Sequence, residues 1–206
     1  MRIIGGEARG RPIHLPGGCR IRPTADRVKK SLFDILHPVT GKLFLDLFAG
    51  TGNVGLESLS RGARFAVFVE RDGRLVELMR KSLAQLGFSE RAEVIAADAE
   101  RGLGRLAQRK ERFDIVFADP PYDEGLIAET VKWLEKGNIL AEGGIVVLQH
   151  SVREAIEGLP IRAMVVSDQR RYGDTVLSFL KGTDSKSVPQ NMGITYEEDC
   201  GISGLV

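Results

Sequence analysis

Residues 43–57, which read LFLDLFAGTGNVGLE, constrain the fold more than any other stretch of this chain. An apolar run that contains one acid, Asp46, leads directly into three glycines spaced as G-x-G-x-x-G, namely Gly50, Gly52 and Gly55. This pattern is typical of a buried parallel strand that turns sharply into a helix, because glycine tolerates the turn and lets the backbone approach a ligand. We expect a cofactor beside this turn, although a turn that binds nothing has the same pattern. NAD and S-adenosylmethionine both use such turns.

Beyond this turn the chain alternates between strand-like and helix-like patterns. Short apolar runs predict strands, and longer segments with apolar residues three and four positions apart predict helices. Elements in this order form a mostly parallel sheet with helices on both faces, which is a Rossmann-like α/β fold. The later strands are predicted at residues 64–69, 92–97, 113–118, 144–150, 162–167 and 175–180, and the helices at residues 53–61, 72–86, 99–109, 126–135 and 151–157.

The two ends of the chain differ from this alternating region. Residues 2–6 and 11–15 are predicted to form a small hairpin, and Thr24 is placed to cap a helix with apolar positions up to residue 36. After residue 180 the periodicity fails, which predicts a poorly ordered tail. The predicted organisation is a basic hairpin and arm at residues 1–23, an α/β domain at residues 24–180 and a tail at residues 181–206.

Positive charge is concentrated near the N-terminus. The chain has a net charge of +1, yet its first 42 residues contain nine Lys or Arg against three acids, a balance of +6. A basic arm on a mildly acidic body indicates an anionic partner such as nucleic acid, although such residues also serve only to keep a helix soluble. We expect phosphate contacts from Arg9, Arg11, Arg20, Arg22, Arg27 and Lys30, and we expect Lys29 on the same exposed surface.

Acids stand at the ends of several predicted strands, where the ligands of an open α/β sheet bind. Glu70 lies 18 residues after Gly52, a spacing at which an acid accepts hydrogen bonds from ribose hydroxyls. Asp98 either accepts from an adenine amine or caps the next helix. Asp46 is expected to bind loop amides or a ligand amine, and it suits a cationic ligand better than a diphosphate.

The tetrapeptide Asp119-Pro120-Pro121-Tyr122 follows the predicted strand at residues 113–118. Two prolines remove two backbone donors and fix the chain, which leaves a rigid carbonyl at Pro120 beside a carboxylate and an aromatic ring. The exocyclic amine of a nucleobase is a poor nucleophile, and two such acceptors hold its N–H groups and turn its lone pair toward an electrophile. Tyr122 offers a face on which the base stacks. The other interpretation is an ordinary Pro-Pro turn.

These residues resemble S-adenosylmethionine-dependent amino-methyltransferases with a (D/N/S)-P-P-(Y/F/W) motif, and more narrowly the RsmD family. The resemblance covers residues 2 to about 180, and the tail lies outside it. It implies a class I methyltransferase domain with a seven-stranded sheet whose last strand is antiparallel. It further implies methyl transfer to N2 of a guanine in small-subunit (16S) ribosomal RNA. The motifs that carry it are RIIGG at residues 2–6, RG at 9–10, RPT at 22–24, DRV at 26–28, residues 45–57, DPPY at 119–122 and YGDT at 172–175.

The resemblance also implies roles for single residues. The methionine part of S-adenosylmethionine is expected against residues 46–52 and near Thr24, its ribose at Glu70 and its adenine at Asp98. The target base is expected at residues 119–122, with Asp119, Pro120, Pro121 and Tyr122 as the catalytic set. The expected cofactor-binding residues are Thr24, Asp46, Phe48, Ala49, Gly50, Thr51, Gly52, Glu70, Arg71, Asp98 and Ala99.

Three other functions remain open. A DNA adenine-N6 or cytosine-N4 methyltransferase uses the same tetrapeptide, although no separate target-recognition region is visible. An NAD-dependent oxidoreductase fits the glycine turn and Glu70 but leaves the Pro-Pro pair without a role. A non-catalytic RNA-binding or ribosome-assembly module fits the basic arm alone.

Composition sets the remaining limits. The chain has 206 residues, of which 43% are hydrophobic and 28% charged, as in globular domains. No apolar run has membrane-spanning length and no signal peptide is recognisable, so we expect a cytoplasmic protein. Cys19 and Cys200 are isolated, which predicts neither a disulfide nor a metal site. The expected partner is 16S ribosomal RNA or an assembling small subunit, and the expected form is a monomer.

Overall fold

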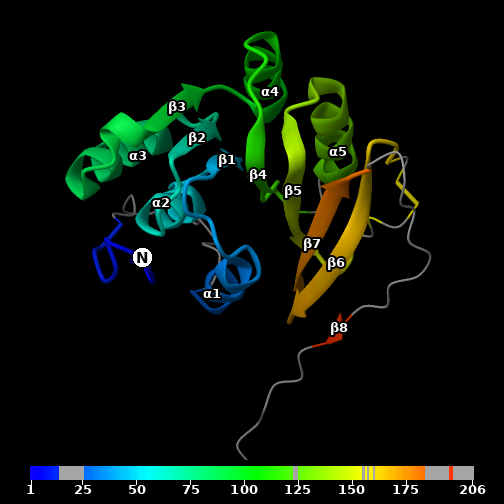
Figure 1. The fold of residues 1–206 in the computed structure, drawn as a ribbon, viewed down its shortest axis with the longest axis horizontal. Helices are drawn as coiled ribbons and strands as arrows, with labels where there is room; N and C mark the ends of the chain where they lie inside the picture. Colours follow the sequence, from blue (N-terminus) through cyan, green and yellow to red (C-terminus); the bar gives the residue numbers. More distant parts are fainter. Residues whose placement is uncertain are drawn as a thin grey trace, which may run out of the picture.

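The computed structural model describes residues 1–13, 26–122, 125–154, 156, 158–159, 161–183 and 195–196. Its strands form a single mixed sheet with the order β3-β2-β1-β4-β5-β7-β6-β8 (Figure 1). The five strands from β3 to β5 in this order are parallel, so their carboxyl ends lie at the same end of the sheet. The strands are β1 (Leu43–Leu47), β2 (Phe65–Glu70), β3 (Ala92–Ala96), β4 (Phe113–Ala118), β5 (Leu140–Ser151), β6 (Met164–Tyr172), β7 (Thr175–Gly182) and β8 (Thr195–Tyr196).

The strand directions agree with the prediction from sequence. β1 pairs in parallel with β2 and β4, and the parallel pairing continues to β3 and β5. β7 is antiparallel to both β5 and β6, which confirms the predicted antiparallel last strand. The two-residue β8 adds to β6 from within the predicted tail. The rest of that tail, beyond Thr183, lies outside the described residues.

Helices cover both faces of this sheet because its strands are apolar on both sides. On β1, Phe44 packs with the apolar faces of α1, α2 and α3, whereas Leu45 and Leu47 point to the opposite face and pack with α4 and α5. Figure 1 shows the two groups of helices on different sides of the strands. In the described part of the chain, no helix is both long and apolar enough to span a bilayer. The helices are α1 (Asp26–Ile35), α2 (Asn53–Ser60), α3 (Gly73–Leu86), α4 (Ala99–Gln108) and α5 (Leu126–Gly137), with a 3₁₀ turn η1 (Ser89–Arg91).

The helix predicted at residues 151–157 is wrong over its described part. Strand β5 continues to Ser151, which pairs with Thr175 of β7, and the backbone N–H of Val152 donates to the Asp174 carbonyl over 3.0 Å. The antiparallel pairing of β5 with β7 therefore uses the backbone groups that a helix would need. The following strand, predicted at residues 162–167, begins two residues later and extends further, since β6 spans Met164–Tyr172.

The predicted N-terminal hairpin is present as a compact loop closed by an antiparallel bridge between Arg2 and Pro12. The N–H of Ile3 donates to the Arg11 carbonyl over 3.0 Å, and the N–H of Ile13 donates to the Met1 carbonyl over 2.9 Å. Ile3 and Ile13 are buried in the same core as α1, α2 and α3. Residues 14–25, which include the predicted cap Thr24, lie outside the described residues.

Candidate active site

The glycine turn forms as predicted between β1 and α2. Phe48, Gly50 and Gly52 have φ angles of 68°, 57° and 77°, all in the left-handed region that glycine adopts readily and a bulky side chain does not. The N–H of Gly52 donates to the Ala49 carbonyl over 2.7 Å, and the N–H of Leu56 donates to the Gly52 carbonyl over 2.8 Å to begin α2. The non-glycine Phe48 at positive φ costs about 1–3 kcal/mol, a strain typical of functional sites.

Glu70, at the end of β2, holds this turn in place. Its Oε2 accepts from the N–H of Gly50 over 2.8 Å, and its Oε1 accepts from the N–H of Asp72 over 2.8 Å. Each carboxylate oxygen has a second lone pair, so these bonds leave acceptor capacity for a ligand hydroxyl. The structure thus gives Glu70 a role in shaping the turn, and its predicted contact with a ribose stays a prediction.

Asp46 lies beneath the turn and is 2% exposed. Its Oδ2 accepts from the N–H of Gly55 over 2.8 Å, at the start of α2. Burial raises the pKa of Asp46 to about 8, the Gly55 hydrogen bond opposes that rise, and the negative charges of Asp119 and Glu70 add to it. A concentration of acids that destabilises a buried carboxylate favours a cationic ligand and disfavours a diphosphate.

A cavity of about 770 Å³ opens at the carboxyl ends of the strands. This volume lies within the usual range for small-molecule sites. The cavity brings together both groups of predicted site residues, those for the cofactor and those for the target base. The predicted residues that line it are Phe48, Glu70, Arg71, Asp98, Ala99, Asp119, Pro120, Pro121 and Tyr122. The predicted residues Ala49, Gly50, Thr51 and Gly52 form the turn beside it without lining it.

Asp98 fills one of its two predicted roles. Its carboxylate accepts from the N–H of Arg101 over 2.9 Å and thereby caps α4, and its Oδ2 lies 3.4 Å from Arg101 Nε. Because Asp98 also lines the cavity, the cap places a carboxylate at the cavity wall. The contact with adenine stays a prediction.

The Asp119–Tyr122 tetrapeptide follows β4 directly, as predicted. Pro120 is buried, whereas the other three residues are partly exposed to the cavity. The Tyr122 hydroxyl lies 3.5 Å from Nε2 of Gln149, at the end of the neighbouring strand β5. A carboxylate, a rigid carbonyl and an aromatic ring therefore share one cavity wall, which suits a planar ligand that carries an amine.

The basic residues predicted to meet phosphates have different surroundings. Arg9 and Arg27 are exposed. Lys30 is exposed and pairs with Asp34 over 2.9 Å. Arg11 donates to the carbonyls of Gln85 and Leu86 at the end of α3, so part of its donor capacity serves the fold. Arg20 and Arg22 lie outside the described residues.

The expectation that Lys29 lies on the exposed surface is wrong. Its side chain is 0% exposed, and its Nζ donates to the Arg2 carbonyl over 2.9 Å and to Asn53 Oδ1 over 2.7 Å. The carboxylate of Glu57, also fully buried, lies 3.3 Å away. Burial lowers the pKa of Lys29, and the charge of Glu57 opposes that shift. Lys29 thus joins α1, the N-terminal segment and the first residue of α2 in one buried polar cluster.

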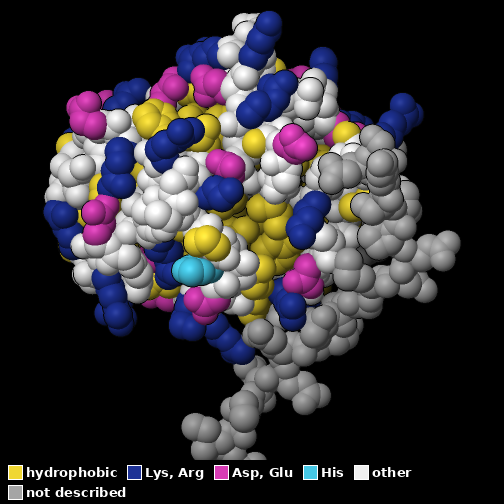
Figure 2. Space-filling model, in the orientation of Figure 1, with side chains coloured by type: hydrophobic (Ala, Val, Ile, Leu, Met, Phe, Trp, Pro, Cys, Tyr) yellow, Lys and Arg dark blue, Asp and Glu magenta, His cyan; other side chains and the backbone are white. Residues whose placement is uncertain are grey.

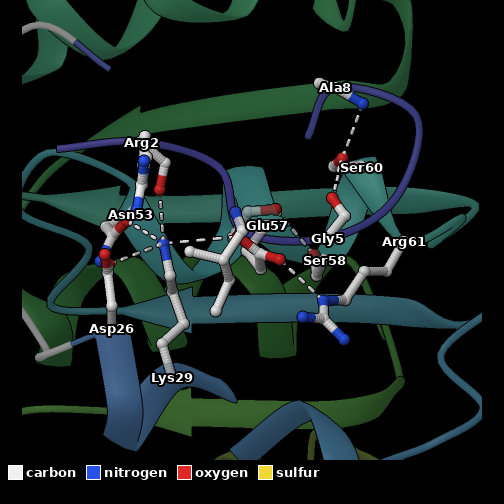
Figure 3. Close-up of polar contacts among 12 residues, drawn as sticks. Arg2, Gly5, Ala8, Asp26, Lys29, Asn53, Glu57, Ser58, Ser60 and Arg61 are labelled. Atoms are coloured by element: carbon white, nitrogen blue, oxygen red, sulfur yellow. Dashed lines mark hydrogen bonds and ion pairs between the residues drawn. The ribbon is translucent and has the colours of Figure 1, made fainter. Parts of the chain in front are cut away.

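Figure 3 shows how the same cluster fixes residues 2–8 on α2. Glu57 Oε2 accepts from the N–H of Ile4 over 2.8 Å, and Ser60 Oγ accepts from the N–H of Ala8 over 2.9 Å. Gly6 has a φ of 74°, and a Cβ built on it would meet the Ser60 carbonyl oxygen at 1.8 Å. The RIIGG motif therefore has a structural role, because only glycine fits against the end of α2 here.

Comparison with known proteins places the chain in a family. Residues 1–181 match the family described as "Conserved hypothetical protein 95". The ribosomal RNA small subunit methyltransferase D of Escherichia coli K12 is 38% identical over 161 residues, 78% of this chain and 79% of that protein. The chain belongs to the RsmD family. The family membership predicted from the motifs is thereby confirmed.

Other members and neighbours agree with this assignment. The Bacillus subtilis protein YlbH is 35% identical over 182 residues, 88% of this chain and 98% of that protein. The structure of Escherichia coli yhhF superposes with a TM-score of 0.78 at 32% identity, covering 89% of this chain and 98% of that one. A more distant structure, SMU.776 complexed with SAH, has a TM-score of 0.63 at 15% identity and covers 75% of this chain and 48% of that one. The predicted Rossmann-like class I methyltransferase fold is confirmed.

The cavity of this RsmD-family protein also contains residues that the sequence patterns did not single out. Gln149 and Thr175 reach it from β5 and β7, and Trp133 reaches it from α5. Trp133 has the spacing of an ordinary core position on a helix, so its sequence context gives no signal. Gln149 carries a weak signal, since a polar residue at the carboxyl end of a buried strand is unusual.

Proposed function

We propose that this protein transfers a methyl group from S-adenosylmethionine to N2 of a guanine in small-subunit ribosomal RNA. The observation that carries the proposal is the shared cavity, where the Asp119–Tyr122 wall faces the same space as Glu70 and Asp98. The 38% identical relative is named as a ribosomal RNA small subunit methyltransferase, which supports the same class of substrate.

S-adenosylmethionine supplies an electrophilic methyl group on a positively charged sulfur. The residues present fit this cofactor. The buried Asp46 lies among other acids, so a cation nearby would be stabilised, and Phe48 lines the cavity beside it. Glu70 and Asp98 would hold its ribose and adenine ends, since both carboxylates reach the cavity wall.

The chain's own groups would then prepare the amine of the base. The carboxylate of Asp119 and the carbonyl of Pro120 accept its two N–H groups and turn its lone pair toward the methyl donor. When the new nitrogen–carbon bond forms, the amine must lose one proton, and the Asp119 carboxylate is positioned to accept it. The Tyr122 ring holds the base plane, which requires that the base leave its stack in the RNA.

The outer surface is compatible with an RNA partner. Figure 2 shows apolar surface gathered in the middle of one face, with Lys and Arg side chains spaced around it. Basic residues of that kind contact phosphates, and an apolar surface accepts unstacked bases. Arg9, Arg27 and Lys30 are the exposed basic residues that we propose for this role.

The test is to treat small-subunit ribosomal RNA and 30S subunits from a strain that lacks the enzyme with purified protein and labelled S-adenosylmethionine. We expect one labelled guanine, with the methyl group on N2. Label on DNA adenine or cytosine instead would support the alternative DNA methyltransferase. Binding of RNA with no label would support a non-catalytic module.

A variant tests whether Asp119, in the cavity wall formed by residues 119–122, takes part in catalysis. We expect Asp119→Ala to bind S-adenosylhomocysteine as the native protein does and to lose about 10²–10⁴-fold in methyl transfer, the usual contribution of a positioned acid–base group. Glu129→Ala, on the exposed surface of α5, serves as the control. Full activity of Asp119→Ala would remove this residue from the mechanism.

A further inference from the structure

Gln149 occupies a position beside the predicted amine-binding wall. Strands β4 and β5 are parallel, and Ala118 pairs with Leu148 at their last shared register position. Asp119 directly follows the end of β4, Gln149 is the next residue of β5, and both line the cavity. Because each residue comes directly after the last paired position and both line one cavity, one ligand can contact both side chains.

The Gln149 amide is buried and only partly satisfied. It is 5% exposed, and its Nε2 donates to the Tyr122 hydroxyl over 3.5 Å. Its Oε1 has no hydrogen-bond partner among the described residues. A buried carbonyl oxygen without a partner is costly, so its presence at a cavity wall indicates a donor on the ligand.

Nucleobases differ in what stands beside the exocyclic amine. In guanine the ring nitrogen N1, next to the 2-amine, carries a hydrogen. In adenine and cytosine the ring nitrogen next to the amine is unprotonated and acts as an acceptor. A protein acceptor beside this ring nitrogen accepts a hydrogen bond from guanine N1–H. In adenine and cytosine the lone pair of the ring nitrogen repels the same acceptor.

Resting on the proposed function, we propose that Gln149 is a specificity-determining residue whose Oε1 accepts a hydrogen bond from guanine N1–H. Asp119 and Pro120 hold the amine of any such base, and Gln149 restricts that wall to guanine. Tyr122 holds the Gln149 amide in the required orientation through the contact to Nε2. The selectivity for guanine thus comes from β5 and the reactivity from the end of β4.

The test compares two RNA substrates with each protein. In one, the labelled position found in the mapping experiment is guanosine. In the other it is 2,6-diaminopurine riboside, which keeps the 2-amine but has an unprotonated N1. We expect the native protein to prefer guanosine by at least about tenfold in kcat/KM, the effect of one buried hydrogen bond.

The variant Gln149→Met keeps the length of the side chain but removes the Oε1 acceptor, together with the Nε2 donor to Tyr122. We expect it to lose activity on guanosine and to bring the ratio between the two substrates close to one. The matched control is Gln169→Met on β6, whose amide bonds Ser178 and does not line the cavity. It should keep the native ratio. Binding of S-adenosylhomocysteine and the melting temperature verify that each variant is folded.

The outcomes separate the two proposals. If the native protein places no methyl group on guanine N2, the proposed function fails. If it methylates guanosine and diaminopurine riboside equally well, the role of Gln149 is overturned, and this measurement needs no variant. A native preference that survives unchanged in folded Gln149→Met also overturns it.

Discussion

The buried carboxyl of Asp46 leads to a prediction that needs no RNA. Burial among acids raises its pKa to about 8, so at pH 7 about 90% of the unliganded protein carries a proton there. A cation bound nearby favours the ionised form, and an adjacent opposite charge lowers a carboxyl pKa by about 1–3 units. If the pKa falls to about 6, binding releases about 0.8 proton at pH 7. Affinity should then rise by up to about tenfold per pH unit toward pH 8 and level off above it.

The assay is titration calorimetry of S-adenosylmethionine, which carries the cationic sulfur, at pH 7 in two buffers that differ in ionisation enthalpy. The difference between the two apparent enthalpies gives the number of protons exchanged. Asp46→Asn is the control, because an amide oxygen still accepts from the N–H of Gly55 but cannot ionise. The ligand's own amine contributes equally to both proteins, so the difference between them isolates Asp46. Equal proton release by both proteins would refute the reasoning.

The same carboxyl affects the unliganded protein. Folded Asp46 keeps its proton up to about pH 8, whereas the unfolded chain loses it near the ordinary value of 3.8. Because the folded state binds more protons between these limits, this group makes stability fall as pH rises, by at most about 1.4 kcal/mol per pH unit. Urea unfolding between pH 5 and pH 8 should show a shallower decline for Asp46→Asn than for the native protein.

Three further predictions concern packing and RNA contacts. Lys29→Met removes one of the two cations beside buried Glu57, the other being Arg61 at 2.7 Å, and leaves Asn53 Oδ1 without its donor, so we expect urea titrations to show a loss of about 1–3 kcal/mol. Lys30→Met, which breaks an exposed pair, should change stability by less than about 1 kcal/mol. An equal effect of the two would mean that the buried pair is not strongly coupled. Gly102→Ala places a Cβ 2.5 Å from Val69 Cγ1 and should lower the melting temperature, whereas Gly104→Ala on the same helix meets no atom within 4 Å and should raise it, with a gain of about 0.5–1 kcal/mol. A reversed order would contradict the packing of α4 on β2. Arg9→Gln should weaken binding to ribosomal RNA and reduce the slope of log affinity against log salt by about one, and an unchanged slope would remove Arg9 from the interface.

Features set by local pattern could be predicted from the sequence. The turn at Gly50–Gly52, the acids Glu70 and Asp98 at strand ends, and the tetrapeptide at Asp119 each depend on a strand that ends and a helix or loop that begins. The end of a strand and the beginning of a helix or loop can be recognised from about ten neighbouring residues, because both follow from apolar periodicity and from the backbone preferences of glycine and proline.

Features that depend on distant partners could not be predicted. Lys29 has the sequence context of an exposed helix residue, and its burial is made tolerable by partners far along the chain, namely the Arg2 carbonyl, Asn53 and Glu57. The position of Gln149 next to Asp119 depends on the register between β4 and β5. The helix predicted from residue 151 does not form over residues 151–154, because β7 and Asp174 bond the backbone groups of Ser151 and Val152 that the helix would need.

The attachment of residues 2–8 to α2 has a consequence for mapping the protein by deletion. A shortened chain that begins after residue 10 would lose basic side chains, but it would also withdraw the N–H of Ile4 from Glu57 and the carbonyl of Arg2 from Lys29. Lys29 and Glu57 would keep each other, Asn53 and Arg61 as partners, but each would lose one hydrogen bond in a buried cluster that includes the first residue of α2. Such a chain would lose cofactor binding and RNA binding together, and the loss would be wrongly read as evidence for an RNA-binding arm. Single substitutions of exposed arginines are the sounder route to the interface.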